Sequence, residues 1–347
     1  MKPIRILHIG NIANNAYLNA KILNTSKKYK CDVLVADYYH IMGCPEWEDA
    51  ILDSKVDEFF PNWEKARLNN FKRPKWFSNG PRFFAIKYLM GEKRTKTFCK
   101  FFNKTYSHLI TYKFLRKILD LLLRISLIFI FRIEFFSKKI SKNKLSDDHA
   151  LSFKNHKENF VKKFPERKKE IKSSDKIFFN YKQLYLYKAL FHNYDIIHCY
   201  GTDPIWPYIA NFKNYVSYEH ATIRKIPFDN SPLSRLVAAS YSNSKHTIIT
   251  NCDSNKYAKK LKCTKYSFVP HPINEKWKNK DFGNTLRKKL ENELNSNFIL
   301  YHPPRQHWEP WRELKKTKYY KIDPAWDKGN DIFFEGFARF CKSTNSN

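Results

Sequence analysis

The sequence predicts an α/β protein built on a doubly wound parallel sheet, with a helical insertion and the start of a second domain of the same kind. Short apolar runs that end in turns alternate with stretches of helical spacing over residues 4–36 and again over residues 195–272. A similar apolar run at 298–301 follows a polar stretch. Buried strands that alternate with crossover helices are typical of parallel, Rossmann-like sheets.

The first predicted element is a strand from Ile4 to Ile9, an apolar run that ends at Gly10. Such a run is typical of a parallel strand that is buried on both faces. Residues 14–27 then carry apolar side chains at helical spacing, and a second buried strand follows at 32–36. The order strand, helix, strand opens a doubly wound domain, which we place at residues 1–275.

Residues from about 38 to 181 break this alternation. The stretch is rich in aromatic residues, proline and lysine, and it is too long for a simple connection, so we predict a largely helical insertion. Within it, the apolar run 118–136 contains four charged residues, and we do not expect it to cross a membrane. Basic residues on both sides of the run suit a helix in the membrane interface, and a helix buried in the protein explains it equally well.

The alternation resumes with predicted strands at 195–199, 215–218, 247–250 and 266–269. Residues 276–296 form a polar connector, and residues 297–347 begin a second Rossmann-like domain with a helix from Ile332 to Phe340. This last part is shorter than the roughly 100–150 residues of a typical domain. We therefore expect the second domain to be incomplete.

The composition suggests a polyanionic partner, because the formal net charge is +31. Lysine greatly outnumbers arginine, and asparagine, isoleucine, phenylalanine and tyrosine are abundant. An AT-rich genome would impose the same usage, so composition alone explains the charge equally well. The seven cysteines include no C-x-x-C pair, which predicts neither a disulfide framework nor a zinc site and favours a reducing cytoplasm.

Four short segments occur in a fixed order along the chain. They are the first strand with its turn (6–10), the segment YEHATIR (218–224), the segment VPHPI (269–273), and PRQHW (304–308) with KGND (328–331). Together they resemble the retaining GT-B glycosyltransferases of the family-4 type, which use nucleotide-activated sugars. The resemblance covers residues 1–37 and about 195–340, and it implies an acceptor-side first domain and a donor-binding second domain.

The resemblance implies a donor-phosphate site in the second domain. Negative charge grows on the leaving nucleoside diphosphate, and an arginine, a lysine and a helix N-terminus can neutralise it without a metal. Arg305 follows the strand at 298–301, and Lys328 and Gly329 precede the last helix. We predict that Arg305 and Lys328 bind the phosphates and that Gly329 lets the backbone approach them.

The resemblance gives the catalytic position to His220. This histidine follows a strand that ends near Tyr218, at the carboxyl edge where such sheets bind ligands. It would position a sugar hydroxyl or support the oxocarbenium-like transition state. A structural histidine with satisfied hydrogen bonds is the alternative interpretation.

Six further residues are candidates for substrate binding. Gly10, Asn11, Asn14 and Asn15 lie in the turn after the first strand, which lacks the G-x-G-x-x-G phosphate fingerprint, and Glu219 and Arg224 flank His220. Each could equally serve to hold its own loop. No histidines and carboxylates have metal-ligand spacing, so we predict no metal and no cofactor besides the nucleotide-sugar substrate.

We therefore expect a cytoplasmic glycosyltransferase that moves a sugar from a nucleotide-sugar to a cell-surface polysaccharide or a lipid-linked glycan. We expect peripheral contact with the anionic inner face of a membrane, and no nucleic-acid partner. The glutamate pair that the family carries later in the second domain has no counterpart before Asn347, so we expect little turnover from this truncated chain. The alternatives are a basic nucleic-acid-binding protein and a non-catalytic binding protein on a transferase scaffold.

Overall fold

The computed structural model describes residues 2–38, 40–50, 70–91, 142–179, 184–274, 280–295 and 330–344, together with isolated residues between 56 and 68. The chain divides into two units, Met1–Glu275 and Lys276–Asn347. Within these described ranges, no helix is both long enough and apolar enough to cross a bilayer. The first unit holds the sheet and is described below by itself.

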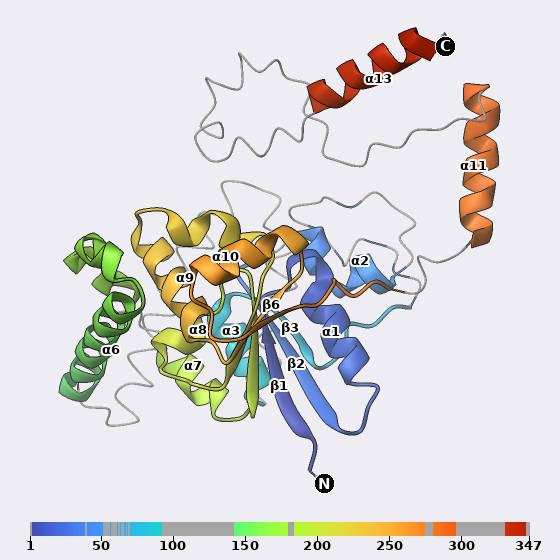
Figure 1. Cartoon of the computed structure of the whole chain (residues 1–347). Coiled ribbons are helices and arrows are strands. Elements are labelled where there is room, and N and C mark those ends of the chain that lie inside the picture. The colour runs from blue at the N-terminus through green and yellow to red at the C-terminus, as the bar shows by residue number, and fades with distance from the viewer. Residues whose placement is uncertain are drawn as a thin grey trace, which may run out of the picture. The chain divides into compact units, whose positions relative to one another are not determined.

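A seven-stranded sheet forms the centre of the first unit, and all of its neighbouring strands are parallel (Figure 1). The strand order is β3-β2-β1-β4-β5-β6-β7, so the chain winds outward from β1 in one direction and from β4 in the other. The predicted Rossmann-like α/β class is therefore confirmed. The strands are β1 (Ile4–Ile9), β2 (Tyr29–Ala36), β3 (Phe77–Gly80), β4 (Ile196–Tyr200), β5 (Tyr215–Tyr218), β6 (His246–Ile249) and β7 (Tyr266–Phe268).

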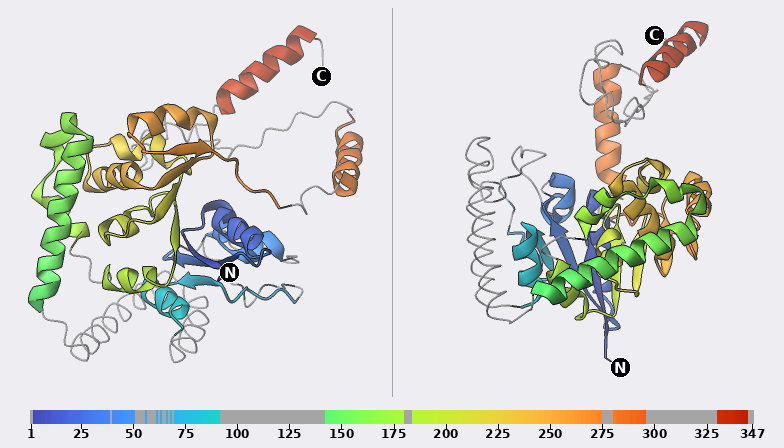
Figure 2. Two further views of the ribbon diagram at one scale, coloured as in Figure 1. Left: turned by 60° about the horizontal axis from the view of Figure 1, so that its bottom comes forward. Right: turned by 90° about the vertical axis from the view of Figure 1, so that its left-hand side faces the viewer.

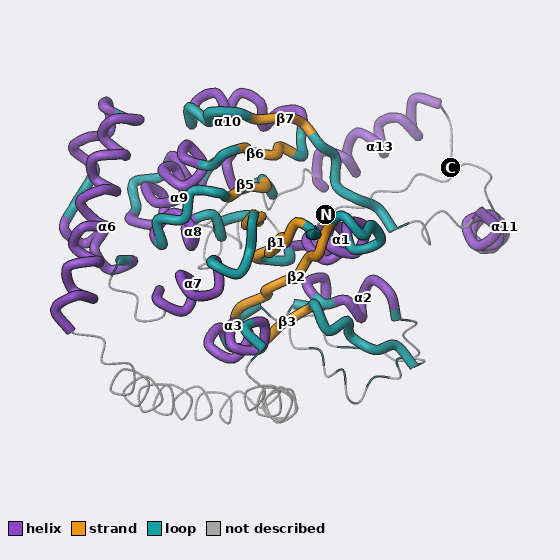
Figure 3. Tube along the Cα trace, turned by 90° about the horizontal axis from the view of Figure 1, so that it is seen from below, coloured by secondary structure: helices purple, strands orange, loops and turns teal. Residues whose placement is uncertain are grey.

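One face of the sheet, which we call the helix-rich face, carries most of the helices (Figure 3). Alternate strand side chains such as Leu7, Ile9, Ile197 and Cys199 point into it and form a large apolar core with these helices. A longer helix, α6 (Lys142–Lys163), lies along the outside of the layer and contacts α9 (Figure 2). The helices of the layer are α3 (Arg82–Leu89), α7 (Leu184–Phe191), α8 (Ile205–Ile209), α9 (Pro232–Asn243) and α10 (Asn255–Lys260).

The opposite face, which we call the α1 face, has less cover. Among the described elements, α1 (Asn15–Leu23) and α2 (Pro45–Asp49) lie on this side, near the β1–β3 end of the sheet (Figure 3). The core of this face is smaller and includes Ile6, Tyr17, Tyr200 and Tyr218. The unequal cover of the two faces follows from the topology. The described helices that connect β3 to β4, β4 to β5, β5 to β6 and β6 to β7 all lie on the helix-rich face.

Local sequence signals explain the start of α9 and its attachment. The Ser231 hydroxyl accepts a hydrogen bond from the Ser234 amide at 3.1 Å, and Pro232 occupies the first helical turn. Serine at the N-cap and proline just inside the helix are both favoured there. From this helix the Arg235 guanidinium binds both carboxylate oxygens of Asp175 at 2.8 and 2.6 Å. The pair is buried and holds the 3-10 helix η4 (Ser173–Phe178) against α9.

The structure differs from the predicted insertion over residues 38–181. Both β3 and α3 lie in that range, and β3 pairs with β2 from Val33↔Phe77 to Ala36↔Gly80. The strand is only four residues long and contains Ser78 and Asn79, so it gives no apolar run that stands out in the sequence. The apolar run at 118–136 lies outside the described residues.

The second unit contains two described helices. α11 (Lys280–Leu294) occupies most of the stretch that we predicted as a polar connector, and α13 (Asn330–Thr344) contains the predicted helix from Ile332 to Phe340. Within α11, Arg287 and Glu291 pair across four residues at 2.7 Å, a spacing that adds a few tenths of a kcal/mol to a helix. The predicted strand at 298–301 lies outside the described residues.

Candidate functional site

The carboxyl ends of β1 and β4 meet where the strand order reverses, which is where open α/β sheets bind ligands. In this protein the crevice there is closely packed. Gly10 has a φ of +86°, and a Cβ on it would collide with Asp203 Oδ2; a Cβ on Gly201 would lie 2.8 Å from Ile12 Cδ1. Burial raises the pKa of Asp203 to about 6, so this carboxyl group is a titratable group near neutral pH beside the predicted turn.

Two of the predicted asparagines in the β1 turn, Asn11 and Asn14, form hydrogen bonds within the protein. The side-chain amide of Asn11 donates to Asn14 Oδ1 at 2.8 Å and to the backbone carbonyl of Gly43 at 2.9 Å. Asn11 Oδ1 accepts from the backbone amide of Tyr17 at 2.9 Å. Asn14 donates to the Cys44 carbonyl at 3.0 Å. Both side chains are 1% exposed. Their hydrogen bonds fix the turn to the chain before α2.

His220 lies at the carboxyl end of β5 and contacts the start of α1. Its Nε2 atom is 3.0 Å from the amide nitrogen of Asn15, which also donates to the Ile12 carbonyl at 3.0 Å. An amide nitrogen can only donate, so the neutral imidazole accepts at Nε2 and carries its proton on Nδ1. The sequence places a histidine after a strand, and the fold adds the partner that fixes its tautomer.

A second histidine stands beside the first. The rings of His220 and His271 are 5.0 Å apart, and His271 Nδ1 is 3.1 Å from the Tyr218 hydroxyl. Burial, and then the neighbouring His271, lower the pKa of His220; burial lowers the pKa of His271, and the Glu219 carboxylate opposes both effects. Both rings are therefore neutral at pH 7 and can donate or accept hydrogen bonds without carrying charge.

Glu219 and Arg224 have different surroundings. Glu219 is fully buried, and it accepts from the Thr250 hydroxyl at 3.2 Å and from the Asn251 amide at 3.5 Å. Its Oε1 atom has no hydrogen-bond partner among the described residues. Arg224 instead forms a partly exposed ion pair with Asp253 at 2.8 Å. Glu219 therefore supports the His220 loop from inside, and Arg224 lies at its outer side.

The chain after β7 closes one side of this group. Residues 269–274, which we call the strap, run from β7 back towards α1 (Figure 3). The backbone amide of Val269 donates to the Ile249 carbonyl at 2.9 Å. His271 forms a hydrogen bond with the Tyr218 hydroxyl, and the side-chain amide of Asn274 donates to Asp49 Oδ1 at 3.2 Å. The strap thus ties β5, β6 and α2 together around His220.

The remaining predicted residues, Arg305, Lys328 and Gly329, lie outside the described residues. Asp203 and His271 were not among the predicted site residues. A signal for both was present in the sequence, because each of them follows a predicted strand by a few residues. Among the described residues, no group of three or more potential ligands could hold a metal ion.

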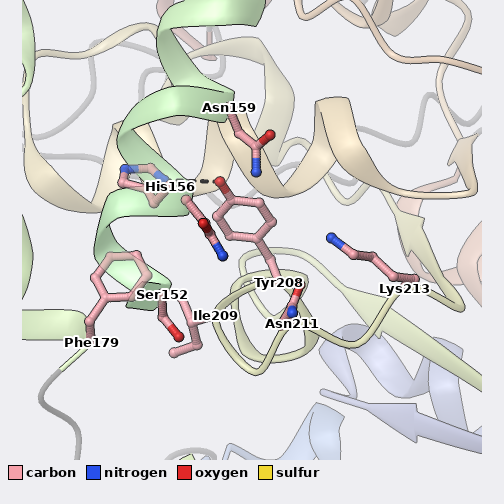
Figure 4. A pocket seen from close by; sticks show the side chains of 9 residues that line it. Ser152, His156, Asn159, Phe179, Tyr208, Ile209, Asn211 and Lys213 are labelled. Carbon is pink, nitrogen blue, oxygen red and sulfur yellow. Dashed lines mark hydrogen bonds between the residues drawn. The ribbon is translucent and has the colours of Figure 1, made fainter. Parts of the chain in front are cut away.

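A separate small cavity of about 20 Å³ lies between α6 and the segment that follows α8 (Figure 4). His156 Nδ1 is 3.0 Å from the Tyr208 hydroxyl, and Asn155, Asn159 and Ser152 complete much of the lining. A space of this size with several polar partners holds about one water molecule. The cavity is therefore too small for a sugar or a nucleotide.

Comparisons with known proteins give no match. No family model matches the sequence, and neither a curated protein nor a solved structure matches it. The fold class therefore rests on the sheet itself, and the function on the residues described above.

Proposed function

We propose that the chain is a glycosyltransferase of the GT-B type, with the first unit on the acceptor side. The observation that carries the proposal is the neutral His220, held by Asn15 at the carboxyl edge of a doubly wound parallel sheet. Ligands bind at this edge in such folds. The order of the four sequence segments that resemble the family-4 enzymes supports the same function.

In this proposal the transfer retains the configuration of the sugar. The bond between the sugar's anomeric carbon and the β-phosphate oxygen breaks, the acceptor oxygen bonds to the same face, and the acceptor proton passes to the departing phosphate. His220 donates from Nδ1 to a sugar hydroxyl, and this hydrogen bond positions the sugar for the transfer. Arg305, Lys328 and Gly329 would bind the donor phosphates, and no metal or cofactor is invoked.

The proposed acceptor is a cell-surface polysaccharide or a lipid-linked glycan, and the proposed setting is the cytoplasmic side of a membrane. A second function, a non-catalytic binding protein on the same scaffold, has one observation in its favour. Asp203 and Ile12 fill the crevice at the strand reversal, so little space is left there for a donor phosphate. We propose no nucleic-acid partner for the site.

The test is release of nucleoside diphosphate from a panel of UDP-, GDP- and dTDP-sugars, with a lipid extract as acceptor, alongside calorimetric binding of each donor. We expect His220→Ala to lower the release by about 100-fold, as misplacement of the reacting atoms does. His192→Ala is the matched control, since His192 is exposed at the end of α7, away from the carboxyl edge. Donor binding without release, unchanged in both variants, would favour the scaffold; no binding of any donor would refute both.

A further inference from the structure

An exposed basic surface follows α6. It consists of Lys168, Lys169, Lys172 and Lys176, which lie in and between the 3-10 helices η3 (Pro165–Glu170) and η4, together with Ile177. All four lysines are exposed, and Ile177 is 70% exposed among them. Ile177 therefore adds an exposed apolar side chain to this group of cations.

Two of the three acidic residues between positions 165 and 177 are neutralised from within, while the third, Glu166, is exposed. Glu170 receives two hydrogen bonds from the Arg167 guanidinium, at 2.9 and 2.7 Å. Asp175 is fully buried in its ion pair with Arg235. Arginines therefore neutralise Glu170 and Asp175, and the four exposed lysines give the surface a positive charge.

Both halves of the surface are fixed to the same part of the fold. Arg167 also donates to the Pro227 carbonyl at 2.7 Å, and Arg235 donates to Asn230 Oδ1 at 2.8 Å as well as to Asp175. Each half is thus anchored on the segment 227–235, and its lysines are exposed to solvent. The surface is presented on a fixed support, so little ordering is needed when it binds.

The end of α10 extends the positive charge. The Lys262 ammonium donates to the Lys163 carbonyl at 2.6 Å, so the chain after α10 lies beside the end of α6 (Figure 1). Lys262 is 47% exposed and lies 3.6 Å from Glu166, which is more exposed still. Lys259 and Lys260 are exposed on the same helix end.

We propose that this surface binds the anionic headgroups of a lipid bilayer, with Ile177 entering the interface. Lysines near an anionic leaflet bind it as point charges, and an apolar side chain among them enters the boundary of the acyl region. Nucleic acid suits this surface less well. Arg167 and Arg235 are bound to carboxylates of the protein itself. The nearby aromatic side chains Phe160, Phe164 and Phe179 are buried and cannot stack on bases. The inference does not depend on the transferase function.

The test is co-sedimentation of the whole chain with vesicles of phosphatidylcholine alone or mixed with phosphatidylglycerol. We expect binding only to the anionic vesicles. The variant K168S/K169S/K172S/K176S should lose at least about tenfold in partitioning, since a lysine near such a surface contributes about fivefold. Ile177→Ser should weaken the binding that remains at high salt, by about tenfold if the side chain is fully inserted.

A matched control separates this surface from the charge of the whole chain. K2S/K27S/K28S/K30S removes the same charge from exposed positions at the amino edge of the sheet, and we expect a change of about twofold or less. Equal losses in the two quadruple variants, or no binding of the wild-type chain to anionic vesicles, would overturn the proposal. Binding to duplex DNA that only the first variant abolishes, without vesicle binding, would assign the surface to nucleic acid instead.

Discussion

The two faces of the sheet differ in chemistry as well as in cover. The helix-rich face is filled by apolar side chains from the helices α3, α6, α7, α8, α9 and α10. Its fully buried ion pair among the described residues, Arg235 with Asp175, is bidentate. On the α1 face, His8 Nδ1 and the Asn19 amide both contact the Tyr200 hydroxyl, at 2.9 and 3.0 Å. The candidate site therefore lies at the end of the more polar face, and the larger apolar core supports it from the other side.

Two buried histidines on the α1 face each have a ring nitrogen that lacks a hydrogen-bond partner among the described residues. His8 and His198 are paired across β1 and β4 with their rings 5.0 Å apart, and the Nε2 atom of each has no partner among the described residues. A buried polar atom without a partner costs roughly 1–3 kcal/mol. This face is thus less stable than an apolar one of the same size, and the comparison predicts different responses to mutation on the two sides.

The largest effect should come from the buried ion pair of the helix-rich face. Asp175→Ala leaves the Arg235 guanidinium buried without its counterion, and we expect the free energy of unfolding to fall by about 3–5 kcal/mol in urea titrations. The double variant D175L/R235M should recover most of that loss, because a buried pair can be replaced by apolar groups. Asp253→Ala, which removes a partly exposed pair, should cost less than about 1 kcal/mol; a similar loss in both single variants would contradict the difference.

The next effect should appear in acid, and on the α1 face it comes from His198. Burial lowers the pKa of His198 to about 4, whereas the same ring in the unfolded chain titrates near 6.5. The unfolded state therefore binds more protons between these values, and stability should fall as the pH falls through this window, by up to about 3 kcal/mol for this group.

His198→Phe should reduce this acid sensitivity, as urea titrations at a series of pH values would measure. His246→Phe is the control, since His246 lies in the same row across β4, β5 and β6 and bonds to the Ser267 hydroxyl at 2.8 Å. If both variants keep the wild-type pH profile, the buried histidines of the α1 face do not set the acid limit.

The smallest effect should be local to the strap. Tyr218→Phe removes the hydroxyl that meets His271, and we expect a loss of about 1 kcal/mol in stability. Amide exchange of residues 269–274 should become faster while the central strands β1 and β4 keep their protection. Tyr266→Phe on β7 serves as the control, and equal exchange in both variants would show that the strap is held by other contacts.

Much of the fold could be predicted from the sequence. The strands at 4–9, 215–218 and 266–269 and the helix at 332–340 were predicted within a few residues of their observed bounds. Strand β3 was missed because its four residues carry too few apolar side chains to form a pattern. For the site, the sequence placed His220, Glu219 and Arg224 around one strand end, while the internal hydrogen bonds of Asn11 and Asn14 appear only in the structure.

The sequence by itself determined the alternation of strands and helices, and with it a parallel sheet whose carboxyl edge carries His220. Only the tertiary structure decided which residues meet there. Asn15 and His220 are 205 positions apart, and Asp175 finds Arg235 across 60 positions. Apolar periodicity reports which side of an element is buried and carries no information on strand order, whereas these contacts depend on which strands become neighbours.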